Sequence, residues 1–351
     1  MFCKYLMTAA TCVAATAALA DDNVTMYGIV DVGLETLSNQ ASGGRSTFMA
    51  GGGSSMPTLW GLRGTEDLGG GLSAFFNLEG GLDASTGSIG NSNGGIFGRQ
   101  AHVGLSGQWG SVKLGLQLDP AFISAVQTDP RGGAQSFSIL PFWIGSNVAS
   151  GESSAKTAAN IFESSAITYS YSAAGFSGTL LYALGGGPGS ANRIVSGGAS
   201  YKGGPVFVTA GAYRNNTPSG ESGPSGWNLG ASYAVTDALS FKGTHLNVKG
   251  HDAAAAHLAT TGFGVSYAMG PMTYNVAYYL SKDETHGGDA KLLTFGLDYA
   301  MSKRTALYAQ AVSAKQSSTG YNGAGLLDVN GGMFTAGKSV SGVALGVRHL
   351  F

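Results

Sequence analysis

The sequence predicts an all-β fold: a sixteen-stranded antiparallel transmembrane β-barrel with short periplasmic turns and long extracellular loops. Three observations lead to this prediction. The chain ends in an amphipathic strand whose last residue is aromatic, alternating apolar and polar segments recur along the chain, and the connections between them alternate between short and long. Strands that face lipid on one side and water on the other show this pattern.

The C-terminal strand, residues 341–351, shows the alternation most clearly. One face is apolar and ends on an aromatic ring: Val343, Leu345, Val347, His349 and Phe351. The other face is mostly small or polar: Ala344, Gly346, Arg348 and Leu350. A period of two places alternate side chains on opposite faces of a strand. We therefore expect this strand to turn its apolar face toward the membrane, with Phe351 at the interface.

The N-terminal segment predicts export from the cytoplasm. A short basic start is followed by an Ala-rich apolar stretch, an Ala18-Leu19-Ala20 cleavage pattern and two aspartates. These features are typical of a signal peptide rather than a spanning helix. We expect residues 1–20 to be cleaved and residues 21–351 to form one barrel domain. Both cysteines, Cys3 and Cys12, lie in the signal peptide, so the mature chain would contain no disulfide.

Composition supports the same class of protein. Glycine makes up 58 of the 351 residues, about two and a half times its usual share. Charged residues make up only 11%, yet no mature segment contains the roughly 18 consecutive apolar residues of a transmembrane helix. The net charge of −1 gives no indication of a nucleic-acid partner, which would require a basic surface.

Sixteen strand candidates can be placed along the mature chain by their alternation. They lie near 24–35, 57–67, 72–79, 97–107, 111–118, 165–172, 176–184, 195–202, 206–214, 227–234, 239–249, 261–268, 272–281, 293–299, 305–315 and 341–351. Seven short connections alternate with eight long ones, so both termini should lie on the side of the short turns. An even number of strands lets the first pair with the last, which leaves no open edge in the bilayer.

The longest connection, residues 119–164, is the strongest functional candidate. Pro120, Pro130 and Pro141 would interrupt any strand, while Phe122, Phe137, Phe142 and Trp143 could pack. A loop of this length is usually functional or disordered. From its residues alone, the loop could either fold into the lumen as a constriction or form a surface or subunit contact.

Three motifs resemble the general diffusion porins of Gram-negative outer membranes. They are the mature start at 24–35, the stretch 59–121 containing LWGLRGTEDLGGGLSAFFNLE and FGRQAHVGLSG, and the ending GVRHLF. The resemblance implies outer-membrane localisation, a homotrimer and a third loop folded into the barrel. It also implies contact with outer-membrane lipid and lipopolysaccharide, and recognition by the barrel assembly machinery through the strand that ends at Phe351.

The resemblance further implies a constriction in which an acidic loop faces a ladder of wall arginines. Arg99 matches one of these arginines, but Leu59, Leu116 and Ile161 occupy other positions of the ladder. Arg63 would partly replace them, and Lys113 and Lys156 are weaker candidates. The expected carboxylates are these five: Asp31, Glu35, Glu79, Asp119 and Asp129. Fewer arginines facing these carboxylates predict a weaker anion preference than is common in the family, or mild cation selectivity.

The predicted function is passive diffusion of ions and small hydrophilic solutes through a water-filled pore. Two alternatives remain: a substrate-specific channel, which apolar Leu59 and Ile161 would suit, and a barrel that acts mainly as a surface receptor or adhesin. An enzyme is disfavoured because the histidines lie outside any nucleophile motif, with His102 and His349 interpreted as interfacial aromatic residues. Neither a catalytic residue nor a cofactor or metal site is predicted.

Overall fold

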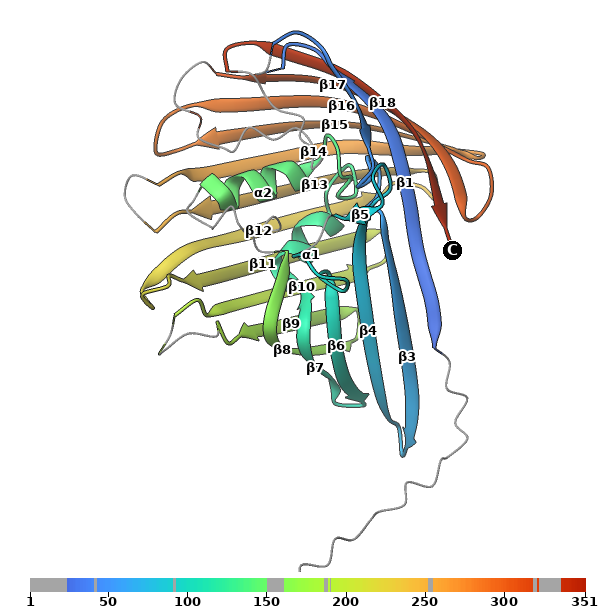
Figure 1. Ribbon diagram of the computed structural model, residues 1–351, viewed down its shortest axis with the longest axis vertical. Helices are drawn as coiled ribbons and strands as arrows, with labels where there is room; N and C mark the ends of the chain where they lie inside the picture. Colours follow the sequence, from blue (N-terminus) through green and yellow to red (C-terminus); the bar gives the residue numbers. More distant parts are fainter. Residues whose placement is uncertain are drawn as a thin grey trace, which may run out of the picture.

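A computed structural model describes residues 24–40, 43–90, 93–149, 161–185, 189, 191–251, 255–317, 321 and 336–351. The predicted signal peptide and Lys156 lie outside these residues. The described part forms a closed barrel of sixteen antiparallel wall strands, with two short additional strands and two helices (Figure 1). None of the helices in this part is long and apolar enough to cross a membrane.

The wall strands follow one another around the barrel in chain order. They are β1 (Thr25–Leu37), β3 (Leu59–Gly69), β4 (Leu72–Asp83), β6 (Gln100–Gly107), β7 (Gly110–Leu118), β8 (Phe162–Ala173), β9 (Phe176–Ala183), β10 (Ile194–Gly203), β11 (Val206–Asn216), β12 (Ser222–Ala234), β13 (Leu239–Lys249), β14 (His257–Met269), β15 (Met272–Asp283), β16 (Asp289–Ala300), β17 (Thr305–Gln316) and β18 (Ser339–Leu350). The short strands are β2 (Ser46–Ala50) and β5 (Ser88–Ile89), and the helices are α1 (Pro120–Gln127) and α2 (Ile139–Ala149).

The barrel closes between the two ends of the chain, as the sequence predicts. β1 pairs with β18 from Ile29↔Leu350 to Leu37↔Gly342, and the two strands lie side by side in Figure 1. Beyond this register, Gly28 and Phe351 exchange two backbone hydrogen bonds of 3.1 Å each. The ring of Phe351 lies over Gly28, where an added Cβ would approach it to 2.3 Å. Glycine at position 28 therefore lets the terminal ring cover the seam, which is the junction between β1 and β18.

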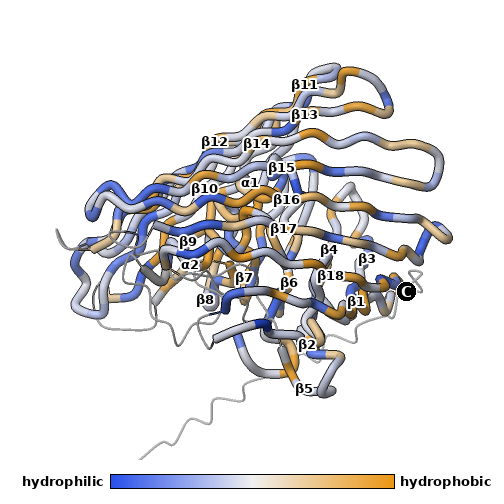
Figure 2. Tube along the Cα trace, turned by 90° about the horizontal axis from the view of Figure 1, so that it is seen from above, coloured by the Kyte–Doolittle hydropathy of each residue, from blue (hydrophilic) through white to orange (hydrophobic). Residues whose placement is uncertain are grey.

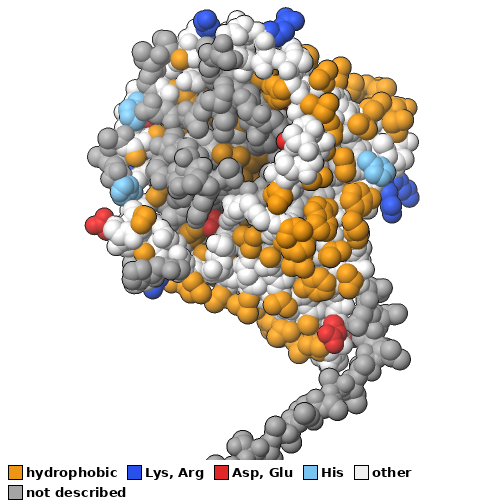
Figure 3. All heavy atoms as spheres, viewed as in Figure 1, with side chains coloured by type: hydrophobic (Ala, Val, Ile, Leu, Met, Phe, Trp, Pro, Cys, Tyr) orange, Lys and Arg blue, Asp and Glu red, His pale blue; other side chains and the backbone are white. Residues whose placement is uncertain are grey.

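The predicted alternation of faces is confirmed along the wall. In β18, Leu345 is 61% exposed on the outer face, whereas neighbouring Ala344 is fully buried. In β15, outward Val276 is exposed, whereas inward Tyr279 is buried. Figure 2 shows hydrophobic residues along the strands and hydrophilic residues gathered toward one end of them. Figure 3 shows hydrophobic side chains spread over the outer wall, with few charges among them.

The seven short turns occur where the sequence predicts them. In several of them a glycine adopts the backbone conformation that the turn requires. Gly70 and Gly175 adopt positive φ of 62° and 84° in the β3–β4 and β8–β9 turns. Residues with a Cβ rarely adopt this left-handed conformation, so glycine is favoured in such tight reversals.

Several strands extend farther into the loops than predicted. β12 begins at Ser222 instead of 227, β14 at His257 instead of 261, and β16 at Asp289 instead of 293. In these extensions the outer face carries polar side chains such as Lys291, while inward Leu258 and Leu292 belong to the main hydrophobic cluster, so the pattern of apolar residues facing outward no longer holds. The short strands β2 and β5 were not predicted, because segments of five and two residues are too short to show a period of two.

The long loop after β7 lies inside the barrel. α1 packs against β9–β13, and α2 packs against α1, β13 and β14. Phe137, Phe142 and Trp143 are buried in the main hydrophobic cluster together with inward wall side chains such as Tyr213 and Tyr279. The inward fold that the family resemblance implies is therefore confirmed, and the apolar core of the molecule lies between this loop and one side of the wall.

Candidate pore constriction

Asp119 fixes the point at which the long loop leaves the wall. It is the N-cap of α1: its carboxylate accepts the backbone N–H of Phe122 at 2.9 Å and the hydroxyl of Ser196 on β10 at 2.9 Å. Pro120 follows at the first helical position, which suits its fixed φ. Burial raises the pKa of Asp119 to about 6, and these hydrogen bonds oppose the increase only in part.

Glycines on the inner wall allow α1 to approach the strands closely. A Cβ at Gly198 would lie 2.5 Å from the carbonyl oxygen of Pro120, and one at Gly230 would lie 1.8 Å from the hydroxyl of Thr128. Side chains of the wall then donate hydrogen bonds to backbone carbonyls of α1. Asn228 donates to the Ala121 carbonyl at 2.9 Å, and Thr209 donates to the Ser124 carbonyl at 2.9 Å. The helix is therefore held directly against β10–β12.

Asp129 organises the turn that follows α1. Its carboxylate accepts the backbone N–H groups of Arg131 and Gly133 at 3.1 and 2.7 Å, and the hydroxyl of Tyr279 on β15 at 2.7 Å. Burial raises the pKa of Asp129. The guanidinium of Arg131 lies on Gly296 of β16, where an added Cβ would clash with Nη1. Asp129 therefore ties the loop to the wall instead of facing water.

Asp31 and Glu35 hold loop segments against β1. Glu35 accepts hydroxyl groups from Ser54 at 3.1 Å and from Ser136 of the long loop at 3.0 Å. Asp31 accepts the backbone N–H of Ser54 and of Met56 at 3.1 and 2.9 Å, and the hydroxyl of Tyr308 at 2.6 Å. Both carboxylates are fully buried.

The two predicted arginines have different surroundings. Arg99 is 7% exposed and forms an ion pair with Glu79, with Nε and Oε1 2.8 Å apart, while its guanidinium lies over the Phe162 ring. Tyr27 donates to the other oxygen of Glu79 at 2.8 Å. Arg63 is exposed, and its guanidinium lies 5.1 Å from the centroid of the Tyr27 ring. Of the two predicted arginines, only Arg63 presents its charge to water.

The contacts of the long loop run along the inner wall from β9 to β1. The part of the wall without such contacts consists of β3, β4, β6 and β7. The inner face of this side carries Arg63, His102 and Lys113, as the strand register shows. His102 is therefore not the interfacial aromatic residue expected from its strand position. It pairs with inward Asn77, and its ring packs edge-on against Phe75 at 6.4 Å between centroids.

The structure brings the seven predicted site residues to the inner side of the wall, but six of them, the five carboxylates and Arg99, are held in hydrogen bonds or an ion pair with other protein groups. The carboxylates lie at protein contacts: Asp31, Glu35, Glu79, Asp119 and Asp129. On the described surface of the loop, the partly accessible side chains are apolar or neutral except for Arg131. Leu59 and Ile161 are each only 7% exposed, so they offer little surface to a less polar solute.

Three further inward cations, Arg131, Lys242 and Arg348, were not among the predicted site residues, although the alternation had already placed Arg348 on the polar face of the last strand. Arg348 forms an ion pair with Asp298 at 3.3 Å, and Lys242 lies beside inward Thr244 on β13. Their positions in the alternation could have identified both residues. Arg131 lies in a turn without any periodicity, so its placement depends on the folded loop. Burial lowers the pKa of Arg131, and neighbouring Tyr279, Asp298 and Asp129 raise it.

The arrangement can conduct solutes, because a polar wall faces a partly apolar loop across a lumen. Among the described residues, no group of three or more histidine, cysteine, aspartate or glutamate side chains is placed to hold a metal ion.

Comparison with known proteins agrees with this architecture. Residues 7–319 match the family model described as Gram-negative porin. The chain belongs to the Gram-negative porin family. It is 31% identical to outer membrane porin protein 32 of Delftia acidovorans over 99% of each chain, and 29% identical to an outer membrane porin protein of Bordetella pertussis over 96% of each. This porin forms a passive diffusion pore in the outer membrane, which it crosses with its strands.

Solved structures share the fold of this porin. The anion-selective porin from Comamonas acidovorans superposes with a TM-score of 0.80 at 29% identity, covering 94% of this chain and 100% of its own. A trimer form of OmpT from Vibrio cholerae has a TM-score of 0.67 at 15% identity, covering 94% and 99%. At this lower identity the likeness concerns the barrel fold alone.

Proposed function

We propose that this porin is a general diffusion pore with a preference for anions, set where the long loop narrows the lumen opposite Arg63. One observation carries this proposal. The five carboxylates expected to line the constriction are buried in hydrogen bonds or an ion pair, whereas Arg63 is exposed to the lumen.

The electrostatic argument depends on which charges face water. A narrow passage with low-dielectric walls focuses the field of any unpaired charge that lines it. Lys113 and Lys242 are partly accessible on the inner wall and add to the positive potential of Arg63. The expectation of mild cation selectivity counted the carboxylates as pore-lining charges, and their burial removes that premise. The solved relative described as anion-selective supports the revised direction.

The measurement that tests this function is the reversal potential of the purified protein in a planar bilayer under a potassium chloride gradient. We expect a stable conducting pore whose reversal potential has the sign of chloride permeation. A pore selective for potassium would overturn the anion preference while leaving the diffusion function intact. Failure of the purified, folded protein to conduct would overturn both.

We also propose that this porin assembles as a homotrimer and that the assembly machinery recognises its C-terminal strand through Phe351. The trimer is supported by the solved OmpT trimer, which has the same barrel fold. Recognition of the C-terminal strand is supported by the exposure of Phe351 on the outer face, at the junction of β1 and β18. Passive conduction requires no chemical step, so we propose no enzymatic activity.

A further inference from the structure

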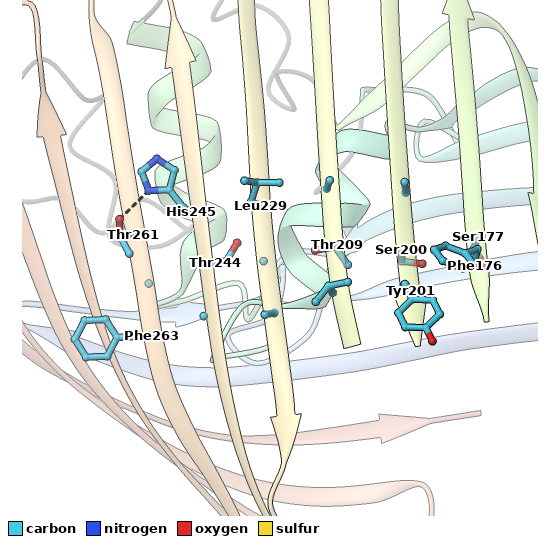
Figure 4. A pocket seen from close by; sticks show the side chains of 17 residues that line it. Phe176, Ser177, Ser200, Tyr201, Thr209, Leu229, Thr244, His245, Thr261 and Phe263 are labelled. Carbon is cyan, nitrogen blue, oxygen red and sulfur yellow. Dashed lines mark hydrogen bonds between the residues drawn. The ribbon is translucent and has the colours of Figure 1, made fainter. Parts of the chain in front are cut away.

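Aromatic rings on the outer wall are ordinary in this porin. Phe176, Tyr201 and Phe263 are exposed there around a shallow trough over β9–β14, as expected for a surface that faces lipid (Figure 4). Phe75 is placed differently, because it lies on the inner face of β4, away from α1 and α2, and is only partly buried. A partly accessible ring in a polar passage is a candidate binding surface, since ligand sites combine aromatic side chains with a few polar groups.

The ring of Phe75 lies against the wall. It extends over Gly104 of β6, where an added Cβ would meet ring atom Cζ at 2.5 Å. The ring of His102 packs against it with centroids 6.4 Å apart and planes at 82°. Because one face of the Phe75 ring covers the backbone of β6, its other face is left to the lumen. Phe75 therefore offers a flat apolar platform inside the pore.

A row of serine hydroxyls lies on the periplasmic side of this platform. Ser73, Ser106 and Ser111 are direct cross-strand neighbours on β4, β6 and β7, on the same inner face as Phe75. All three side chains are partly accessible, and within the described residues none of their hydroxyls bonds to another protein group. Because neighbouring strands lie about 4.8 Å apart, a solute with several hydroxyl groups can bond to two of these serines at once.

Cationic and amide groups lie on the other sides of the platform. Lys113 of β7 is the cross-strand neighbour of the glycine beneath the ring. Arg63 pairs with Asn77, which is two residues from Phe75 along β4. The Tyr27 hydroxyl donates to Asn77 Oδ1 at 2.8 Å, so the amide nitrogen of Asn77 remains available as a donor to a solute. Arg63, Asn77 and Phe75 line one open cleft of about 420 Å³.

We propose that this part of the inner wall is a binding site for an acidic monosaccharide, such as a uronic acid or a sugar phosphate. The apolar face of the sugar ring stacks on Phe75, its hydroxyls bond to Ser106 and Ser111, and its anionic group pairs with Lys113 or Arg63. The affinity is modest, because a pore must release what it binds. The inference rests on the proposed function and deepens it by naming a class of solute that the anion-preferring lumen retains.

Phe75→Leu tests the platform, because it keeps an apolar side chain on the inner face but removes the flat ring. Its matched control is Phe241→Leu, which makes the same change on the outer face of β13, where the ring is exposed. A compact, heat-modifiable band shows that both variants are folded.

The double variant Ser106→Ala/Ser111→Ala tests the hydroxyl row. It removes two neighbouring hydroxyls from the inner wall with almost no change in side-chain volume. Its matched control is Ser240→Ala/Ser266→Ala, which removes two neighbouring hydroxyls from the inner face of β13 and β14, away from Phe75.

The probes are glucuronate, cyclohexanecarboxylate, which has the same ring size and charge but no hydroxyl, and glucose, which has the hydroxyls but no charge. Binding is measured by saturation-transfer NMR on the folded protein in detergent, and in parallel by the reduction of the chloride current in a planar bilayer. We expect the wild type to bind glucuronate about fivefold more tightly than either other probe. Phe75→Leu and the Ser106/Ser111 variant should each lose about fivefold in affinity for glucuronate, and both controls should bind it like the wild type.

Equal wild-type affinity for glucuronate and cyclohexanecarboxylate would overturn the proposal, because any carboxylate near a cation would then suffice. Equal affinity of the four variants for glucuronate would also overturn it, and equal affinity for glucuronate and glucose would overturn the role of the cations. The NMR titration does not depend on conduction. Loss of saccharide binding beside a normal chloride reversal potential therefore overturns this site alone, whereas a silent or potassium-selective pore overturns the proposed function.

Discussion

At the scale of single residues, the five carboxylates that were expected to line the constriction instead tie together segments that are distant in sequence. Glu35 and Ser136 are 101 residues apart, and Asp129 and Tyr279 are 150 residues apart, yet each pair forms a hydrogen bond. A sequence shows that these side chains point inward, but it does not show whether water or another segment meets them. The direction of ion selectivity depends on that difference.

Arg63 should control selectivity more than any other single residue. Arg63→Gln removes an exposed charge from the lumen, worth about 0.5–1 kcal/mol to a passing ion, so the ratio of anion to cation permeability should fall about two- to fivefold. Reversal potentials in a salt gradient measure this ratio. Arg45→Gln, in an exposed loop, is the control and should leave the ratio unchanged. Equal ratios for both variants would contradict the role of Arg63.

Asp119 should make stability depend on pH in an unusual direction. Its pKa in the folded protein is about 6, above the ordinary value of 3.8, so the native state holds the proton more tightly. This contribution to stability is therefore present below about pH 4 and is lost as pH rises through 6. Asp119→Asn keeps an N-cap residue without the charge, so it should match the wild type at low pH.

At pH 8, Asp119→Asn should be more stable than the wild type by about 1–3 kcal/mol. Thermal unfolding in detergent from pH 4 to 8 measures the difference between the two proteins. A wild-type advantage that grows with pH would show that the ionised carboxylate stabilises the fold.

At the scale of elements, the long loop should limit the current. Deleting 126–136 removes the ties at Asp129 and Ser136 and the turn at Arg131, so the lumen should widen and single-channel conductance should rise roughly twofold. A deletion of 218–220, in the β11–β12 loop, is the control and should not change conductance. Unchanged conductance in the 126–136 deletion would mean that another part of the chain forms the narrowest point.

Most wall strands and all seven short turns could be predicted from the sequence, because hydropathy with a period of two and turn residues are local signals. Near the long loops the outward face is no longer apolar, and the predicted strands therefore begin too late, at 227 instead of Ser222 and at 261 instead of His257. The helices α1 and α2 could not be predicted, because α1 forms against glycines of distant strands such as Gly198 and Gly230, and α2 packs on α1, β13 and β14. The constriction depends on these long-range contacts.

At the scale of the whole molecule, closure of the barrel should depend on its last residue. Deleting Phe351 removes two backbone hydrogen bonds and a ring that covers Gly28, a loss of about 1–3 kcal/mol at the seam. The fraction of protein that runs as a compact, heat-modifiable band after refolding should therefore fall. Phe295→Ala, on the outer face of β16, removes a ring without opening the seam and should refold normally. Equal yields would show that β1 and β18 close without the terminal residue.

The proposed homotrimer should be visible in single-channel recordings. Three barrels that insert together should produce conductance changes in groups of three equal steps, and cross-linking in detergent should give a limiting species of three chains. Single steps with a monomeric cross-linking pattern would contradict the homotrimer.

The pairing of β1 with β18 also constrains the order of events during biogenesis. The strand made first acquires its second neighbour only when the strand made last arrives, so its polar edge must remain hydrated or shielded by another protein until synthesis is complete. A truncated chain that lacks β18 would have two free edges and no way to hide them in hydrocarbon. Premature insertion is thus penalised by the topology itself, and only a full-length polypeptide reaches the membrane as a sealed cylinder.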